Sequence, residues 1–148
     1  MQGRRWVEAY ETLGYSFIPS QAANVGETNW SPLVTRLADE DVKYLTFTST
    51  FEELVPLQKA MDAHGYQPVV TELLPNFYNH KYPELAAQQG APLDGVYVKL
   101  STFPFEEADE RPAIRQYLDL LEAAVPGAEP EQLGLQAFSA WLLFATAA

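Results

Sequence analysis

The sequence has no cysteine and only two histidines among its 148 residues. The missing cysteine excludes disulfides, thiol catalysis and cysteine metal sites, and it says little about the redox compartment. His64 and His80 lie far apart, and neither has a partner at a ligand spacing, so the sequence predicts no metal site. It gives no sign of a cofactor either.

Catalytic and phosphate-binding motifs are also missing. The eight glycines never form a GxGxxG or GxxxxGK pattern, and no serine lies in a GxSxG elbow. Glu52-Glu53 and Glu106-Glu107 are poor acid–base pairs, because adjacent residues on a helix point to different faces. No aspartate follows a predicted strand, where a receiver-like fold would hold its metal. The sequence therefore predicts a protein that is not an enzyme.

Basic residues and long apolar runs are scarce. The chain has nine lysines and arginines and 20 acidic residues, which gives a formal net charge of −11. Such a surface repels phosphate backbones and anionic membranes, so no nucleic-acid partner is expected. The most apolar tract, Ala137 to Ala148, is shorter than the roughly 20 residues that span a bilayer. No signal peptide opens the chain, because residues 4 to 10 are already helix-like.

What the sequence does contain is a βαβ unit between Lys43 and Glu72. An aromatic and β-branched strand, Lys43 to Thr48, precedes a helix from Glu52 to His64, and Pro68 to Glu72 forms the next strand. Gly65 stands where a helix ends in a left-handed residue. The apolar stripe of the helix consists of Leu54, Leu57, Ala60 and Met61.

The remaining chain alternates between helical and strand patterns. Helices are predicted at residues 4–13, from Asn29-Trp30-Ser31-Pro32 onward, and at 84–89, 112–124 and 131–148, with strands at 15–18 and 94–100. This alternation predicts a single α/β lobe over residues 1–148, a three-layer αβα fold with a mainly parallel sheet. The last helix is hydrophobic nearly all round, which predicts burial on more than one side.

Candidate functional residues follow the strands, because open parallel sheets bind ligands beyond the carboxyl ends of their strands. Hydroxyls bind a carboxylate, an acidic side chain binds an ammonium, and aromatic rings cover an apolar part. This content predicts a small amphoteric ligand, although the rings could instead close the end of the sheet or pack on a neighbour. The candidates are Ser49, Thr50, Phe51, Glu72, Phe77, Tyr78, Ser101 and Phe103.

Five stretches carry a resemblance to a known family. They are Glu11-Thr-Leu-Gly14, Gly26-Glu-Thr-Asn-Trp-Ser-Pro-Leu33, Leu57 to Gly65, Gly95-Val-Tyr-Val98, and a closing set of Tyr117, Pro126-Gly127 and Gln136 to Ala140. In this order and spacing the chain resembles the C-terminal lobe of type I periplasmic solute-binding proteins, the branched-chain amino acid receptor family of ABC transporters. Asn29 stands in place of the usual aspartate, and both residues cap helices.

The resemblance implies a non-catalytic solute-binding module, one lobe of a transporter receptor for amino acids or similar small polar or amphoteric solutes. It implies that the loops after three strands contact the solute, with Glu72 or a neighbour as the partner of an α-amino group. Thr50 stands where several members have an aromatic residue. The full-length protein would serve a membrane permease, and it would be extracellular or periplasmic, lipid-anchored or secreted.

The first lobe of the family has no counterpart in this sequence. The resemblance therefore implies a fragment or a truncated relative of a two-lobe binding protein, and its bare half would favour self-association. An alternative function remains open, an interaction or regulatory domain of the same fold that no longer binds a small molecule. Its loop aromatics would then contact protein.

Overall fold

The structure, a computed structural model, describes residues 2–18, 26 and 28–147. Glu27, within the second resembling stretch, and the last helical residue predicted, Ala148, lie outside the described residues. The elements in chain order are α1 (Gln2–Glu11), α2 (Ser31–Asp39), β1 (Tyr44–Phe47), α3 (Phe51–Ala63), β2 (Val70–Leu73), the 3₁₀ helix η1 (Pro75–Phe77), α4 (Lys81–Gln89), β3 (Val96–Val98), the 3₁₀ helix η2 (Phe105–Glu107), α5 (Pro112–Ala124) and α6 (Gln132–Ala147).

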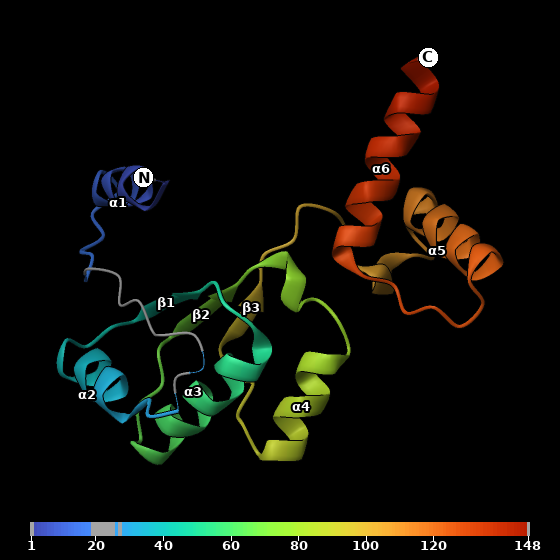
Figure 1. The fold of residues 1–148 in the computed structure, drawn as a ribbon. Coiled ribbons are helices and arrows are strands. Elements are labelled where there is room, and N and C mark those ends of the chain that lie inside the picture. Colours follow the sequence, from blue (N-terminus) through green and yellow to red (C-terminus); the bar gives the residue numbers. More distant parts are fainter. Residues whose placement is uncertain (1, 19–25, 27, 148) are drawn as a thin grey trace.

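The sheet is parallel, with strand order β1-β2-β3 (Figure 1). The central strand β2 places Glu72 opposite Thr46 on one side and Tyr97 on the other. Helix α3 connects β1 to β2, and α4 lies between β2 and β3 in the chain. The predicted βαβ unit is therefore confirmed, and so is the α/β class with its parallel sheet.

One face of the sheet packs on helices α2, α3 and α4 (Figure 1). The stripe predicted on α3 is confirmed, because Leu54, Leu57 and Met61 are buried. Two apolar clusters fill this layer, one around α3 and α4 and one between α2 and α3. The first consists of Leu54, Val55, Leu73, Phe77, Tyr82, Ala86 and Ala91, and the second of Trp30, Val34, Leu57 and Met61.

The opposite face of the sheet is more open. Side chains alternate between the faces of a strand, so Tyr44, Thr46, Glu72 and Tyr97 point away from the helical layer. Tyr97 is 58% exposed and Tyr44 is also exposed. Helix α1 lies on this side (Figure 1), which agrees with a three-layer α/β lobe.

The strand predicted at Tyr15 to Ile18 is wrong. These residues are described, and they form no ladder with another strand. Their rings pack locally instead, with the Tyr10 ring centroid 5.6 Å from that of Tyr15 and 5.8 Å from that of Phe17. Alternating aromatics indicate a strand only where a neighbouring strand supplies hydrogen-bond partners. Here the Tyr15 N–H donates to the Tyr10 carbonyl of α1 at 3.2 Å instead.

Helix boundaries differ from the predictions by a few residues. Helix α2 has Trp30 as its N-cap, with no side-chain capping bond, and proline in its first turn as predicted. Helix α4 begins at Lys81 rather than Glu84, because Pro83 is tolerated in a first turn. Gly65 follows α3 with φ of +64°, which confirms the predicted left-handed stop.

Helices α5 and α6 form a separate packing unit beside the sheet (Figure 1). Its core contains Ala108, Ile114, Tyr117 and Leu135, and α6 also contacts η1. The predicted burial of α6 on several sides is wrong for the described residues, since only Gln132 and Leu135 of this helix are buried. Among the described residues, no helix is both long and apolar enough to cross a membrane.

Candidate functional site

The loop after β1 holds its hydroxyls close to α3. The Ser49 hydroxyl donates a hydrogen bond to Glu53, and the Gly26 N–H donates to the same carboxylate at 3.1 Å. These two hydrogen bonds lower the pKa of Glu53, because they stabilise its charged form. Thr50 is the N-cap of α3, and its carbonyl accepts the Leu54 N–H at 3.0 Å. Phe51, at the first turn, is half-buried against the cluster around α3 and α4.

Glu72 lies inside β2 and not in the loop that follows it. Its carboxylate accepts a hydrogen bond from the Tyr44 hydroxyl on the open face of the sheet. Burial raises the pKa of Tyr44 well above its usual value, and the bond to Glu72 adds to this effect. The structure therefore separates Glu72 from the loops with which the sequence grouped it.

Phe77 packs in the core and does not face a loop surface. Its side chain is 1% exposed, and its ring centroid lies 6.2 Å from that of Phe47 and 5.6 Å from that of Tyr82. Both pairs are edge-to-face, the arrangement that aromatic quadrupoles favour. In this conformation Phe77 offers no surface to a ligand.

Tyr78 contacts the segment that follows β3. Its hydroxyl donates to Glu106 and accepts the Phe105 N–H at 2.8 Å. The Tyr78 and Phe105 rings stack with centroids 5.1 Å apart. Tyr78 thus links the loop after β2 to η2, which opens the α5–α6 unit.

The third candidate loop is also tied to the α5–α6 unit. Gln136 donates its side-chain N–H to the Ser101 hydroxyl at 3.0 Å. Phe103 is 51% exposed, and the Arg111 guanidinium lies 3.7 Å above the centre of its ring. Such a cation–π contact is worth roughly 0.5–1 kcal/mol at an exposed position. The loop is therefore held in place, with one face of the Phe103 ring occupied.

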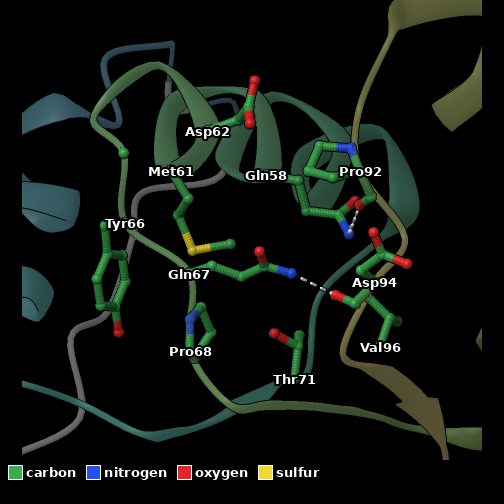
Figure 2. Close-up of a pocket in the computed structure, with 11 residues that line it drawn as sticks. Gln58, Met61, Asp62, Tyr66, Gln67, Pro68, Thr71, Pro92, Asp94 and Val96 are labelled. Carbon is green, nitrogen blue, oxygen red and sulfur yellow. Dashed lines mark hydrogen bonds between the residues drawn. The ribbon is translucent and has the colours of Figure 1, made fainter.

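A cavity of about 210 Å³ lies at the amino ends of β2 and β3 (Figure 2). We call it the amino-edge cavity, and it lies far from the candidate residues. Gln58 donates to the Pro92 carbonyl at 3.0 Å and is paired with the Tyr82 hydroxyl. Gln67 donates to the Asp94 carbonyl at 2.8 Å. The amides at this cavity have partners within the chain.

A second cavity, of about 200 Å³, lies at the carboxyl ends of the strands. We call it the carboxyl-edge cavity. It joins three parts of the chain: the start of α3, the segment from η1 to α4, and the start of α6. It brings together only two of the eight predicted residues, Phe51 and Tyr78. Its lining consists of Phe51, Pro75, Asn76, Tyr78, Asn79, Lys81, Glu131, Gln132 and Leu133.

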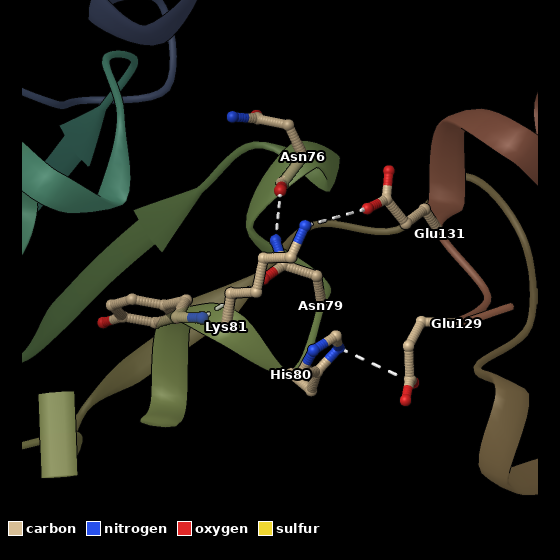
Figure 3. Close-up of polar contacts among 7 residues, drawn as sticks. Asn76, Asn79, His80, Lys81, Glu129 and Glu131 are labelled. Atoms are coloured by element: carbon tan, nitrogen blue, oxygen red, sulfur yellow. Dashed lines mark hydrogen bonds and ion pairs between the residues drawn. The ribbon is translucent and has the colours of Figure 1, made fainter. Parts of the chain in front are cut away.

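Lys81 and His80 each approach a carboxylate across this edge (Figure 3). The Lys81 ammonium lies 3.9 Å from the Glu131 carboxylate, and His80 Nδ1 lies 3.6 Å from Glu129. All four side chains are exposed, so the Lys81–Glu131 ion pair contributes about 0–1 kcal/mol. No local sequence pattern shows that the start of α6 reaches the loop after β2, so the predicted site residues did not include Lys81, Glu131 or Gln132.

Metal ligation finds no support in the described part of the chain, where no group of three or more histidine, aspartate or glutamate side chains could hold an ion. The carboxyl-edge cavity instead offers one cation, one anion, side-chain amides and two rings. This set can bind a small molecule through hydrogen bonds and opposite charges, with an apolar portion against the rings.

Tyrosine ionisation gives a first test of this arrangement. Burial and the hydrogen bond to Glu106 raise the pKa of Tyr78 to about 12. A pKa above the unfolded value of about 10 adds stability that is complete below pH 10 and is lost as the pH rises toward 12. We expect Tyr78→Phe to lose less stability than the wild type between pH 9.5 and 11.5, measured by urea denaturation at each pH.

Four other tyrosines also have raised pKa values: Tyr44, Tyr66, Tyr82 and Tyr117. Tyr78→Phe should therefore reduce the slope of the unfolding free energy against pH without removing it. Glu106→Gln is the companion variant, because it removes the charge beside the phenol and should reduce the slope as well. Equal slopes for Tyr78→Phe and the wild type would show that Tyr78 is not held as described.

Comparison with known proteins gives one match. The family model described as periplasmic binding protein matches residues 2–148, nearly the whole chain. Neither the curated proteins nor the solved structures gave a match. The family supports a solute-binding role, is generally non-catalytic, and implies a periplasmic or extracellular location. The fold, the sheet edge and this match together place the chain in the type I periplasmic binding protein family, of the branched-chain amino acid receptor type.

Proposed function

We propose that this chain is one lobe of a two-lobe substrate-binding protein of an ABC transporter, and that it binds amino acids or similar small amphoteric solutes. The observation that carries the proposal is the carboxyl-edge cavity, in a chain whose family binds small solutes. The full-length protein would be lipid-anchored or secreted and would deliver its solute to a membrane permease. No catalytic step is part of the proposal.

The proposed contacts come from the loops at the carboxyl edge. Phe51 and Tyr78 line the cavity directly, and Leu133 adds an apolar side chain from α6. Ser49, Thr50, Ser101 and Phe103 lie in the neighbouring loops and would meet a solute held against the opposing lobe. Glu72 would contact it only from the open face of the sheet, beside Tyr44.

An interaction or regulatory domain of the same fold is the second candidate. It is favoured by the exposed apolar side chains of α6, which include Trp141, Leu143 and Phe144. In that case the loop aromatics contact protein and no solute binds. Oligomeric state together with solute titration separates the two functions, because a tight dimer that binds no solute supports only the second.

Titration followed by amide NMR tests solute binding. Leucine, glutamate, lysine and succinate are added separately to the ¹⁵N-labelled chain. We expect at least one solute to shift the amides of residues 49–51, 76–81 and 131–133. The amides of residues 62–67, at the amino-edge cavity, are the internal control and should stay in place.

Two variants sharpen the titration. Phe51→Ala removes a half-buried ring that lines the cavity and should weaken binding about tenfold, which corresponds to about 1.4 kcal/mol. Val69→Ala shortens an exposed side chain just before the amino end of β2, away from the carboxyl edge, and should leave the affinity unchanged. Shifts confined to residues 62–67, or none with any solute, would contradict the proposal.

A further inference from the structure

The amino-edge cavity lies at the edge of the sheet opposite to the proposed solute contacts. Its walls come from the end of α3, the loop between α3 and β2, the start of β2 and the segment that leads into β3 (Figure 2). Among the described residues that line it there is no lysine, arginine or histidine, but there are two aspartates, Asp62 and Asp94. Neither carboxylate has a hydrogen bond or ion pair with another described residue.

The side-chain N–H and phenol donors at this cavity are already engaged within the chain. Gln58 and Gln67 donate to backbone carbonyls of the segment before β3. The Tyr66 hydroxyl donates to the Val42 carbonyl at 2.7 Å. The carboxylates that remain unpaired can only accept hydrogen bonds. A ligand that fits this cavity must therefore bring donors.

Helix α3 adds negative potential at the same place. It ends at Ala63, and both Asp62 and Gly65 line the cavity, so the carboxyl end of the helix lies at its wall. This end of a helix is equivalent to about half of a negative charge. Among the described residues no group of three or more histidine, aspartate or glutamate side chains could hold a metal ion. These features favour an organic cation with N–H donors.

Thr71 supplies an independent observation. The residue is 4% exposed, and its hydroxyl has no hydrogen-bond partner among the described residues. Only Trp30 Nε1 and Gln132 Oε1 are fully buried and unpartnered in the described part of the chain, so the Thr71 hydroxyl keeps some exposed surface. Figure 2 shows the side chain pointing from β2 into the cavity, toward Gln67. A nearly buried hydroxyl without a partner costs free energy, which a ligand at this cavity would recover.

We propose that the amino-edge cavity is a second binding site, which takes a short alkyl diamine in its diammonium form. Its ammonium groups donate to the Thr71 hydroxyl and to the carboxylates of Asp62 and Asp94. Its alkyl chain lies against Met61 and Val96, which also line the cavity. A volume of about 210 Å³ is below the roughly 300–1,000 Å³ of pockets for drug-sized ligands, so the chain must be short.

This site goes beyond the proposed solute-binding function, because it lies at the other edge of the sheet and needs no opposing lobe. A ligand carboxylate would be repelled by the two aspartates and by the end of α3. Amino acids are therefore expected to bind here only weakly. Residues 62–67 thus remain a valid control for the solutes titrated at the carboxyl edge.

The test is a titration at pH 7 followed by amide NMR, with four compounds of similar chain length. They are 1,5-diaminopentane, lysine, pentylamine and 1,5-pentanediol. Lysine is the diamine with a carboxylate added, and the diol is its uncharged counterpart. We expect 1,5-diaminopentane to shift the amides of residues 62–67 and 94–96 and to bind about tenfold more tightly than lysine. Pentylamine should bind more weakly than the diamine, and the diol should cause no shifts.

Three variants test the contacts. Thr71→Val keeps the shape of the side chain and should weaken diamine binding about fivefold. It should not lower the urea midpoint, because the hydroxyl that it removes is unpartnered. Asp62→Asn and Asp94→Asn should each weaken binding about threefold, since both carboxylates are exposed. Asp119→Asn removes the same charge from an exposed position of α5 and is the matched control, with unchanged affinity.

Three results would overturn the inference. Equal weakening in Asp119→Asn and Asp62→Asn would mean that the diamine is attracted only by the acidic surface as a whole. Equal affinity for lysine or the diol would mean that the cavity does not recognise a cation free of a carboxylate. No shift at residues 62–67 with the diamine would mean that the site does not exist. The proposed function is tested separately, because its solutes shift residues at the carboxyl edge.

Discussion

Replacing Phe77 with alanine is expected to destabilise the chain by about 3–5 kcal/mol, the usual cost of removing a large buried ring. Phe77 is almost completely buried and contacts the rings of Phe47 and Tyr82 edge-to-face. Truncation would therefore leave a cavity between β1, η1 and α4. Urea denaturation followed by far-UV circular dichroism measures the loss.

Phe103→Ala is the control, because this ring comes from the same set of predicted ligand contacts and is half exposed. It should cost no more than about 1 kcal/mol, mainly its contact with Arg111. A loss of 3–5 kcal/mol could unfold a domain of ordinary stability, so Phe77→Leu serves as a milder variant with an expected cost of about 1–2 kcal/mol. Equal denaturation midpoints for Phe77→Leu and Phe103→Ala would contradict the core position of Phe77.

Local sequence patterns were sufficient for the elements whose partners are close in the chain. The stripe on α3, the glycine stop after it and the two flanking strands all follow from short-range periodicity. The strand predicted at residues 15–18 does not form, because a strand exists only if another strand pairs with it, and a local pattern does not show whether such a partner is present. The alternating rings of Tyr15 and Phe17 pack on the ring of Tyr10 instead.

The candidate site was predicted only in part, for two physical reasons. Strand boundaries decide which face a side chain occupies, and placing Glu72 inside β2 directs it to the open face of the sheet. The position of Gln132 depends on how the α5–α6 unit docks against η1, which no local pattern records. Phe51 and Tyr78 both line the carboxyl-edge cavity, which agrees with the rule that ligands bind at the carboxyl ends of parallel strands, a rule that depends on topology alone.

Helix α6 leads to the second large expected effect, which concerns a proposed self-association of the chain. No charged residue occurs between Gln132 and Ala147, although the chain carries a net charge of −11. Trp141 is 71% exposed, and Leu142, Leu143 and Phe144 are exposed beside it. An uncharged apolar surface of this kind favours contact with the same surface of a second copy. The other surfaces are acidic and repel one another, so contact between copies is expected at α6. We propose that the chain forms dimers or larger assemblies through α6.

The double variant Trp141→Glu/Leu143→Glu is expected to weaken this association at least about a hundredfold, because each large apolar side chain buried at the contact contributes roughly 2 kcal/mol. Sedimentation velocity over a range of protein concentrations measures the change. Gln116→Glu/Ala123→Glu adds the same two charges at exposed positions of α5 and is the matched control. Added salt should strengthen association of the wild type, because it screens repulsion between the acidic surfaces. A wild-type chain that stays monomeric throughout, or equal association of the two double variants, would show that α6 is not the contact.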